Sequence, residues 1–421
     1  MKLNKSSFLQ GSPAGCIALA AFLPAALPAQ TSKPDPSKAE VRLPAAGDWR
    51  AFLLLDNGST GIWTVESFPV FPQYAVPEVV GLDDSGRCHV LVSYSGKWTP
   101  RQIIHDGKWL GGLAHADVDP RVAGSELYTG GKLGNLYQIV AHPQGALDCR
   151  LIAYLPGREI HTIVAGDLDP RSEGSELLVF TSPGGLYRAS PSGPHGGFVL
   201  EHLQNLPGRV RDAVVLPGTA GGRPWIATVS RAGSLELLLL DDSGPLWSTI
   251  HAARMGKGRL ALGPPGKGGS TVLYSTHDDG RVLRHEGSPG GKWTTETIYL
   301  GPQGPRGIAA GRFHRDPAVE TVAVFGYSKK VQILSREPSG SWKAETVFED
   351  RDKGHWLAAA ELDGRNATRE IIGSGYGARI FMLARPPGYG MEGIPVDPDG
   401  DKKTDPVAPS SRTKRAPRER R

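Results

Sequence analysis

Loops rich in Arg, His and Trp recur along this chain about every 49 residues. The candidate ligand-binding residues in and beside these loops are Trp109, Arg158, His161, Arg211, Arg259, Arg306, His355 and Trp356. Counted along the repeat, three of these side chains occupy the same position, namely His161, Arg306 and His355. Such recurrence indicates that the fold brings these side chains to one place.

These residue types suit the recognition of a negatively charged ligand. An Arg guanidinium presents paired planar donors to a carboxylate or a phosphate. A Trp ring presents an apolar face to a sugar, and a His can take or give a proton near neutral pH. The loops therefore predict a site for a small anion or an acidic sugar. The alternative is that Gly-Arg is a common turn pair, so that these basic residues only solvate the loops.

An acidic fragment marks the same repeat and shows which elements position the loops. Its closest copies are Asp117-Val-Asp119-Pro-Arg121 leading to Glu126, and Asp167-Leu-Asp169-Pro-Arg171 leading to Glu176. A weaker copy begins at Glu361. Short strand-like runs separated by Gly, Pro and Ser turns surround each copy, which predicts antiparallel hairpins. No sustained helical period of apolar residues is present beyond the N-terminal leader.

Seven such units fit between residues 49 and 385, so we predict an all-β, seven-bladed β-propeller of four-stranded antiparallel blades. The seventh unit lacks a fourth strand, because Pro386 and Pro387 follow its third. The run Trp49–Asp56 has no other place and is predicted to close the last blade. The innermost strands of a propeller line its channel, so the basic loops should ring one mouth. A linear β-solenoid is the alternative.

The two ends of the chain predict export and a solvated tail. Residues 1–29 carry Lys2 and Lys5, a short apolar stretch and small residues before Gln30, which is typical of a signal peptide. We therefore expect a secreted or periplasmic protein, with no transmembrane segment. Residues 30–48 are predicted to be a linker, and residues 386–421 a disordered basic tail. Basic residues cluster at the extreme C-terminus and the blades alone are near neutral, so the net charge of +5 indicates no nucleic-acid-binding domain. We expect a monomer.

The acidic fragment resembles the FG-GAP or VCBS repeat of the integrin α-chain propeller and of many secreted bacterial proteins. In that family the loop can hold calcium through alternating oxygen ligands. The resemblance implies calcium as a possible cofactor, bound by Asp117, Asp119, Glu126, Asp167, Asp169 and Glu176. This chain departs from the pattern, because Arg121, Arg171 and Arg365 stand where the family has a third acidic residue. The alternative is that these carboxylates accept backbone N–H bonds and only pin the turn.

Three functional hypotheses follow. No hydrolase elbow, HExxH, P-loop or dinucleotide fingerprint is present, which favours a binding protein for a saccharide, a small anion or an extracellular protein. FG-GAP-like propellers also resemble those of some polysaccharide lyases and of a sugar dehydratase that uses metal ions. Under that alternative, His161 and His355 transfer protons and Arg306 or Arg211 neutralises a substrate carboxylate. The third hypothesis is a purely structural surface protein.

Overall fold

The computed structural model describes residues 42–389, except 59, 75, 95–96, 194–196, 217, 219–222, 363 and 365. The predicted signal peptide at 1–29 and all of the predicted tail beyond residue 389 lie outside these residues. The described part of the chain holds 29 strands and one short 3-10 helix, η1 (Lys267–Gly269). It contains no helix that is long and apolar enough to cross a membrane.

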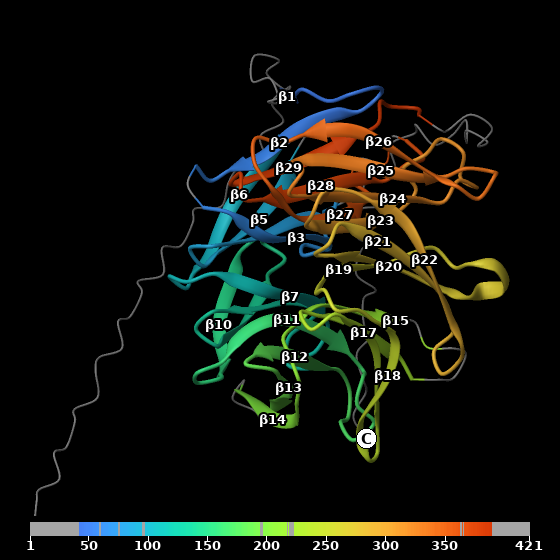
Figure 1. Ribbon diagram of the computed structural model, residues 1–421. Helices are drawn as coiled ribbons and strands as arrows, with labels where there is room; N and C mark the ends of the chain where they lie inside the picture. The colour runs from blue at the N-terminus through green and yellow to red at the C-terminus, as the bar shows by residue number, and fades with distance from the viewer. Residues whose placement is uncertain are drawn as a thin grey trace, which may run out of the picture. The chain divides into compact units, whose positions relative to one another are not determined.

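The strands form seven antiparallel sheets, which are the blades of a propeller (Figure 1). Blade 1 contains β3 (Ile62–Phe68), β4 (Glu78–Asp83), β5 (Arg87–Tyr94) and β6 (Lys97–His105). Blade 2 contains β7 (Leu110–Ala116), β8 (Glu126–Gly131), β9 (Asn135–Ala141) and β10 (Leu147–Tyr154). Blade 3 contains β11 (Glu159–Gly166), β12 (Glu176–Ser182), β13 (Gly185–Ser192) and β14 (Gly197–Asn205).

The remaining blades repeat this order. Blade 4 contains β15 (Val210–Leu216), β16 (Trp225–Ser230), β17 (Ser234–Asp241) and β18 (Gly244–Ala252). Blade 5 contains β19 (Lys257–Leu262), β20 (Thr271–His277), β21 (Arg281–Gly287) and β22 (Trp293–Leu300). Blade 6 contains β23 (Pro305–Ala310), β24 (Thr321–Gly326), β25 (Lys330–Arg336) and β26 (Trp342–Glu349). Blade 7 contains β27 (Gly354–Ala360), β28 (Glu370–Gly375) and β29 (Arg379–Ala384), together with β2 (Arg50–Asp56) and β1 (Arg42–Leu43). The first strands contact one another in the closed order β3, β7, β11, β15, β19, β23, β27 and back to β3.

The N-terminal strand closes the ring, as the sequence predicts. Strand β2 pairs antiparallel with β29, with Phe52 opposite Met382. The guanidinium of Arg385 lies 4.3 Å from the ring centroid of the buried Trp49 and 4.4 Å from that of Tyr389. These cation–π contacts fasten one end of the propeller chain to the other. Strand β1 adds a fifth strand inside the range 30–48, so the sheet begins earlier than the predicted linker allowed.

The second strand of a blade is its most buried element. All residues of β4, β8, β24 and β28 are buried, because neighbouring blades cover both faces of each sheet. In the interface between blades 3 and 4, Leu178 and Phe180 pack with Ile226 and Leu238. These strands therefore lack a regular alternation of apolar and polar residues.

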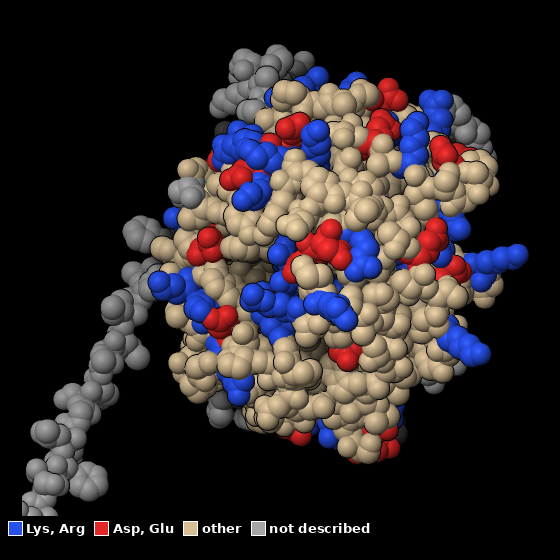
Figure 2. All heavy atoms as spheres, viewed as in Figure 1, with Lys and Arg blue, Asp and Glu red and all other residues tan. Residues whose placement is uncertain are grey.

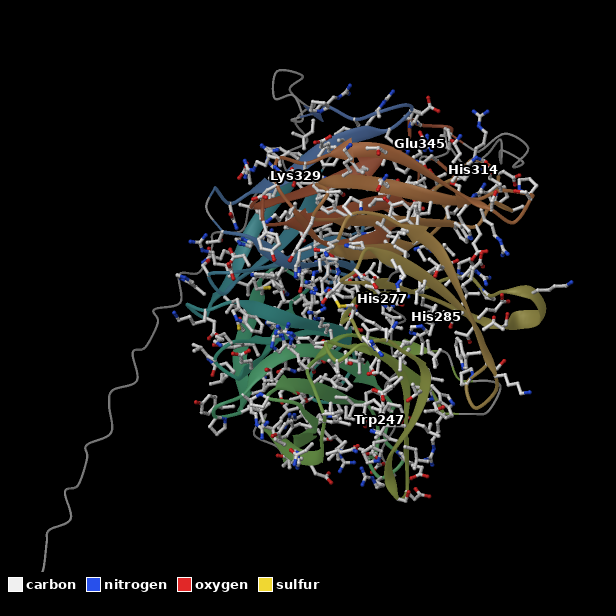
Figure 3. All side chains as sticks on the ribbon, in the orientation of Figure 1. Trp247, His277, His285, His314, Lys329 and Glu345 are labelled. Atoms are coloured by element: carbon white, nitrogen blue, oxygen red, sulfur yellow. The ribbon has the colours of Figure 1, made fainter. Side chains whose placement is uncertain are left out.

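One blade interface contains an ionisable cluster instead of an apolar contact. Lys257, the first residue of β19, is fully buried at a position where earlier blades place Ile62, Leu110, Ile160 and Val210. Its Nζ lies 2.5 Å from His277 Nε2 and 3.1 Å from His251 Nδ1. His285 belongs to the same cluster, and its Nε2 lies 2.9 Å from Ser275 Oγ (His277 and His285 are labelled in Figure 3).

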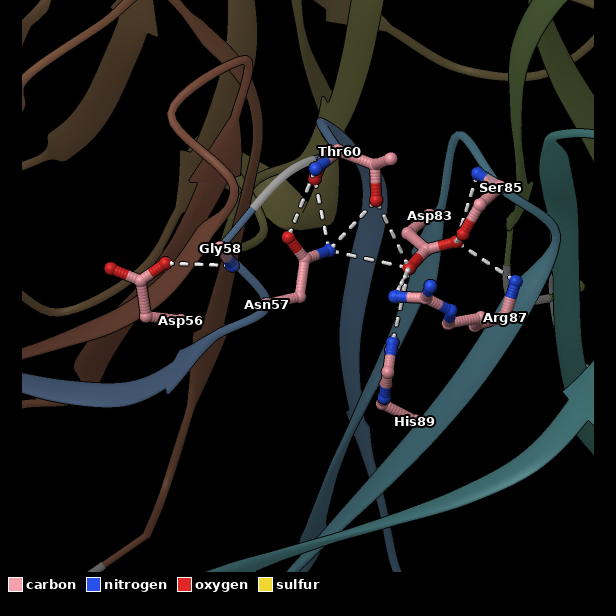
Figure 4. A network of polar contacts seen from close by, with 8 residues as sticks. All are labelled: Asp56, Asn57, Gly58, Thr60, Asp83, Ser85, Arg87 and His89. Carbon is pink, nitrogen blue, oxygen red and sulfur yellow. Dashed lines mark hydrogen bonds and ion pairs between the residues drawn. The ribbon is translucent and has the colours of Figure 1, made fainter.

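A polar network joins blade 7 to blade 1 (Figure 4). The buried Asp83 carboxylate accepts the backbone N–H bonds of Ser85 and Arg87, at 3.0 and 2.8 Å. It also contacts His89 Nε2 and accepts a bond from the Asn57 side-chain amide, each at 3.2 Å. Burial acts to raise the pKa of Asp83, but these hydrogen bonds hold it below its usual range. The network fixes both the turn between β4 and β5 and the connection between β2 and β3.

Candidate functional site

A β-bulge near the start of the first strand of every blade leaves at least one residue outside the ladder. In blade 5 the bulge contains two residues. The bulged residues are Trp63, Gly111, His161, Arg211, Gly258 with Arg259, Arg306 and His355. A bulge re-aims a side chain away from the sheet, and here all of these residues line one cavity.

The cavity lies at one end of the central channel and measures about 350 Å³. Besides the bulged residues, its lining consists of Thr64, Trp109, Glu159, Arg209, Arg231 and Tyr376. We call this cavity the mouth. It joins six of the predicted ligand-binding residues, namely Trp109, His161, Arg211, Arg259, Arg306 and His355. Figure 2 shows Lys and Arg side chains gathered near the middle of the face in view, with fewer Asp and Glu side chains among them.

The mouth has an aromatic half and a cationic half. On blades 7 to 3, the Trp63 ring meets His355 edge-on at 4.3 Å, and Trp109 lies 4.7 Å from His161. Blades 4 to 6 supply all five arginines of the lining. A ligand therefore meets flat apolar faces on one side and guanidinium donors on the other.

Two of the arginines share a counter-charge. Nη1 of Arg211 and Nη1 of Arg306 each lie 2.9 Å from Asp278 Oδ1. Arg211 Nη1 also donates to the backbone oxygen of Lys257, at 2.8 Å. Asp278 thus demonstrates that a carboxylate fits between two guanidinium groups of the mouth.

Two other arginines of the mouth, Arg209 and Arg231, have no such counter-charge among the described residues. Neither Arg209 nor Arg231 makes a side-chain hydrogen bond or ion pair with any of the described residues, and Arg209 Nε is buried. Burial and the neighbouring Arg231 lower the pKa of Arg209. The positive charge of this half is therefore incompletely neutralised by the protein itself.

The floor of the mouth is a stack of charged and aromatic groups. The Arg259 guanidinium lies 4.0 Å from the ring centroid of Trp356, whose indole N–H donates to Glu66 Oε1 at 2.8 Å. Burial and nearby arginines lower the pKa of Arg259 to about 10, while burial raises that of Glu66 to about 8 and that of Asp212 to about 6. Trp356 consequently lies beneath the mouth and holds Arg259 in place, rather than lining the cavity as predicted.

Two histidines of the mouth are held neutral. Burial and the nearby Arg209 lower the pKa of His161 to about 3, although its Nε2 lies 3.2 Å from Glu159 Oε2. Burial also holds the pKa of His355 well below its usual range. The 2.7 Å contact with the backbone oxygen of Trp63 makes His355 Nδ1 the donor, which leaves Nε2 as the acceptor.

Arg158 lies apart from the mouth. It donates to the backbone oxygen of Pro183 at 3.0 Å and lies over the Tyr187 ring. The lining residues absent from our predicted set are Trp63, Thr64, Gly111, Glu159, Arg209, Arg231, Gly258 and Tyr376. The spacing from Trp63 to the bulge at Gly111 was the available signal for Trp63, since it matches the repeat.

The acidic loops lie away from the mouth, and their carboxylates bind the protein itself. Glu176 Oε1 accepts the backbone N–H bonds of Leu168 and Asp169, each at 2.7 Å. Glu126 makes the equivalent bonds in blade 2. Asp119 pairs with Arg121 at 2.6 Å, and Asp169 pairs with Arg171 at 2.7 Å. Asp117 and Asp167 are exposed. Over the described residues, no group of three or more His, Cys, Asp or Glu side chains is arranged to hold a metal ion.

Comparison with known proteins supports the fold alone. No protein-family model matches the chain, and no curated protein matches its sequence. Among solved structures, the chain is similar to the WD40 β-propeller domain of Doa1, with 13% identity, a TM-score of 0.53, and 79% of this chain and 96% of that chain covered. It is similar to streptogramin B lyase, with 10% identity, a TM-score of 0.54, and 80% and 98% covered. It is also similar to BBS1N in complex with ARL6DN, with 12% identity, a TM-score of 0.54, and 83% and 99% covered. The resemblance to the FG-GAP family thus stays a prediction.

Proposed function

We propose that this protein is an exported binding protein whose mouth holds the anionic group of a saccharide, a small anion or a protein partner. The observation that carries the proposal is the pair Arg209 and Arg231, which face one cavity without a bonded partner among the described residues. Export rests on the signal-peptide pattern of residues 1–29.

The electrostatics of the mouth support this proposal. Five guanidinium groups line a cavity whose lining includes one carboxylate, that of Glu159, while Asp278 pairs with two of the five. Partly buried like charges destabilise one another, and a buried donor without a partner costs free energy. A bound carboxylate or phosphate removes both costs, because it accepts charge-assisted hydrogen bonds from several guanidinium groups.

The proposal is tested by calorimetric titration and thermal unfolding of the full chain. We expect glucuronate, but not glucose, to raise the melting temperature. Loss of one charge-assisted bond costs about 1.5–3 kcal/mol, so Arg209→Ala should weaken glucuronate binding about tenfold or more. Arg150→Ala, on the exposed outer strand β10, is the matched control and should bind as the wild type does. Equal affinities for the two variants would refute the proposal.

A second function, catalysis by proton transfer, is favoured by one contact in the mouth. His161 Nε2 lies 3.2 Å from the Glu159 carboxylate, which can orient the imidazole and stabilise its protonated form when a bound ligand gives up a proton. Mass spectrometry of an acidic oligosaccharide incubated with the protein tests this function. Conversion by the wild type and loss of conversion in His161→Ala, with binding retained, would support it; an unchanged ligand would exclude it for that substrate.

A further inference from the structure

Exposed apolar side chains concentrate at the mouth end of the propeller. In each blade the second and fourth strands end there, and the first and third strands begin there. Nine large apolar side chains are exposed among the described residues. Six of them belong to turns or strand ends at this end of the molecule: Leu133, Tyr154, Met255, Leu300, Tyr327 and Tyr376. We call these six residues the apolar rim.

Several contacts connect the apolar rim to the cationic mouth. Leu133 follows Lys132, whose ammonium group pairs with Glu159 of the mouth. Met255 precedes Gly256, where a Cβ would lie 3.2 Å from Arg211 Nη1. The ring of Tyr327 has the Arg306 guanidinium 5.6 Å and the Lys353 ammonium 5.2 Å from its centroid. Leu133, Met255 and Tyr327 therefore lie beside residues that line the mouth or pair with its charged groups.

The opposite end offers no comparable combination in the described residues. Its acidic loops are neutralised internally, since Arg121 and Arg171 pair with the carboxylates beside them. Of the exposed apolar side chains, Val199 and Leu246 lie toward that end. Val199 lines a cavity of about 740 Å³ with Arg171 and Arg188, but both of these arginines pair with Asp169.

The composition of the rim favours a protein over a polysaccharide. The three tyrosines of the rim suit either ligand, but the three aliphatic side chains, Leu133, Met255 and Leu300, offer no flat face on which a sugar ring can stack. Leu300 is 72% exposed. Exposed apolar groups that gather at one end of a molecule mark protein–protein interfaces, where a few buried anchors carry most of the affinity. The positive charge requires those anchors to be acidic.

We propose that the mouth end docks an extended acidic segment of another protein. An Asp or Glu side chain of the segment enters the mouth and binds Arg209 and Arg231, while flanking apolar residues cover the rim. This inference rests on the proposed anion site and adds the class of its partner.

Three polyanions of comparable charge test the inference by surface binding to the full chain. They are a random Glu–Leu–Tyr copolymer, polyglutamate and polygalacturonate. We expect the copolymer to bind about tenfold or more tightly than either other polymer, because only it buries the rim. The double variant Leu133→Ser with Leu300→Ser should lose that advantage. The matched control Val199→Ser with Leu246→Ser, at the other end, should keep it.

The outcomes separate the two proposals. Equal or tighter binding of polygalacturonate, or an unchanged copolymer affinity in the rim variant, overturns docking of a protein segment and makes an acidic polysaccharide the occupant. If glucuronate still binds the wild type in that case, the anion site itself stands. If neither glucuronate nor any of the polymers responds to Arg209→Ala, the anion site and the inference fall together.

Discussion

Replacing Lys257 by Met should change the pH dependence of stability in a defined direction. Its ammonium group lies in a blade interface with imidazole neighbours at 2.5 and 3.1 Å, and no carboxylate of the described residues lies within ion-pair distance. Burial lowers the pKa of Lys257 to about 7. In the unfolded chain a Lys has a pKa of about 10.4. The unfolded state therefore binds more protons between these two values, so stability rises with pH across that window.

The magnitude follows from the two pKa values. At pH 7 the buried lysine costs the folded state about 4 kcal/mol, and at pH 9.5 it costs about 1 kcal/mol. Met removes this cost but leaves the acceptor nitrogens of His251 and His277 without their donor, at a cost of about 1–3 kcal/mol. We expect Lys257→Met to be more stable than the wild type at pH 7 and to lose about 3 kcal/mol of that difference by pH 9.5.

Urea unfolding of wild type and Lys257→Met at both pH values measures this difference. Both values lie above the pKa of about 6.5 of an unfolded histidine, so the neighbouring imidazoles contribute little to the change. Lys343→Met, on an exposed position of β26, is the control and should show no such pH dependence. A difference between wild type and Lys257→Met that stays constant across this range would refute the reasoning.

Three further outcomes are expected. Trp49→Ala should cost about 3–5 kcal/mol in urea unfolding, because it empties a buried site and removes the stack on Arg385; a loss near zero would exclude a role in closing the ring. Glu176→Ala should cost about 1–3 kcal/mol through two lost backbone bonds, whereas Glu176→Gln keeps the acceptor. Burial raises the pKa of Glu176 to about 7, so the folded state holds a proton that the unfolded state has already released. Wild-type stability should therefore fall as the pH rises toward about 7, and the Gln variant should lack this fall. Calcium or a chelator should leave the melting temperature unchanged, since Arg121 and Arg171 already pair with Asp119 and Asp169; stabilisation by calcium would contradict this.

The ring was predictable because its signals are periodic. The acidic loops show the spacing of the repeat. The last unit has only three strands of its own, so the apolar run Trp49–Asp56 was the available fourth strand. Strand β1 was not predictable, because two residues carry no period. Its pairing depends on the edge that β2 presents once the ring has closed.

The sequence predicted the location of the site at one mouth of the channel, but not the direction of every side chain. Pro156-Gly-Arg158 and Pro207-Gly-Arg209 are the same local sequence, yet Arg209 faces the mouth and Arg158 turns to the Pro183 oxygen. The direction of a long side chain on a loop depends on neighbours that only the folded chain brings close. The same holds for Trp356, because Arg259 covers it from another blade.

The bulges of the first strands have a consequence for how this molecule can change. A bulged residue has no ladder partner, so the packing of the blade does not select its side chain. Trp63, Gly111 and Arg306 occupy equivalent places in the same framework. In this propeller, the residues that determine folding are therefore different from the bulged residues that line the mouth. Randomising the bulged positions other than Gly111 and Gly258, where a Cβ would come within 2.9 and 2.3 Å of a neighbouring side chain, should yield a family of receptors with new preferences and nearly constant stability.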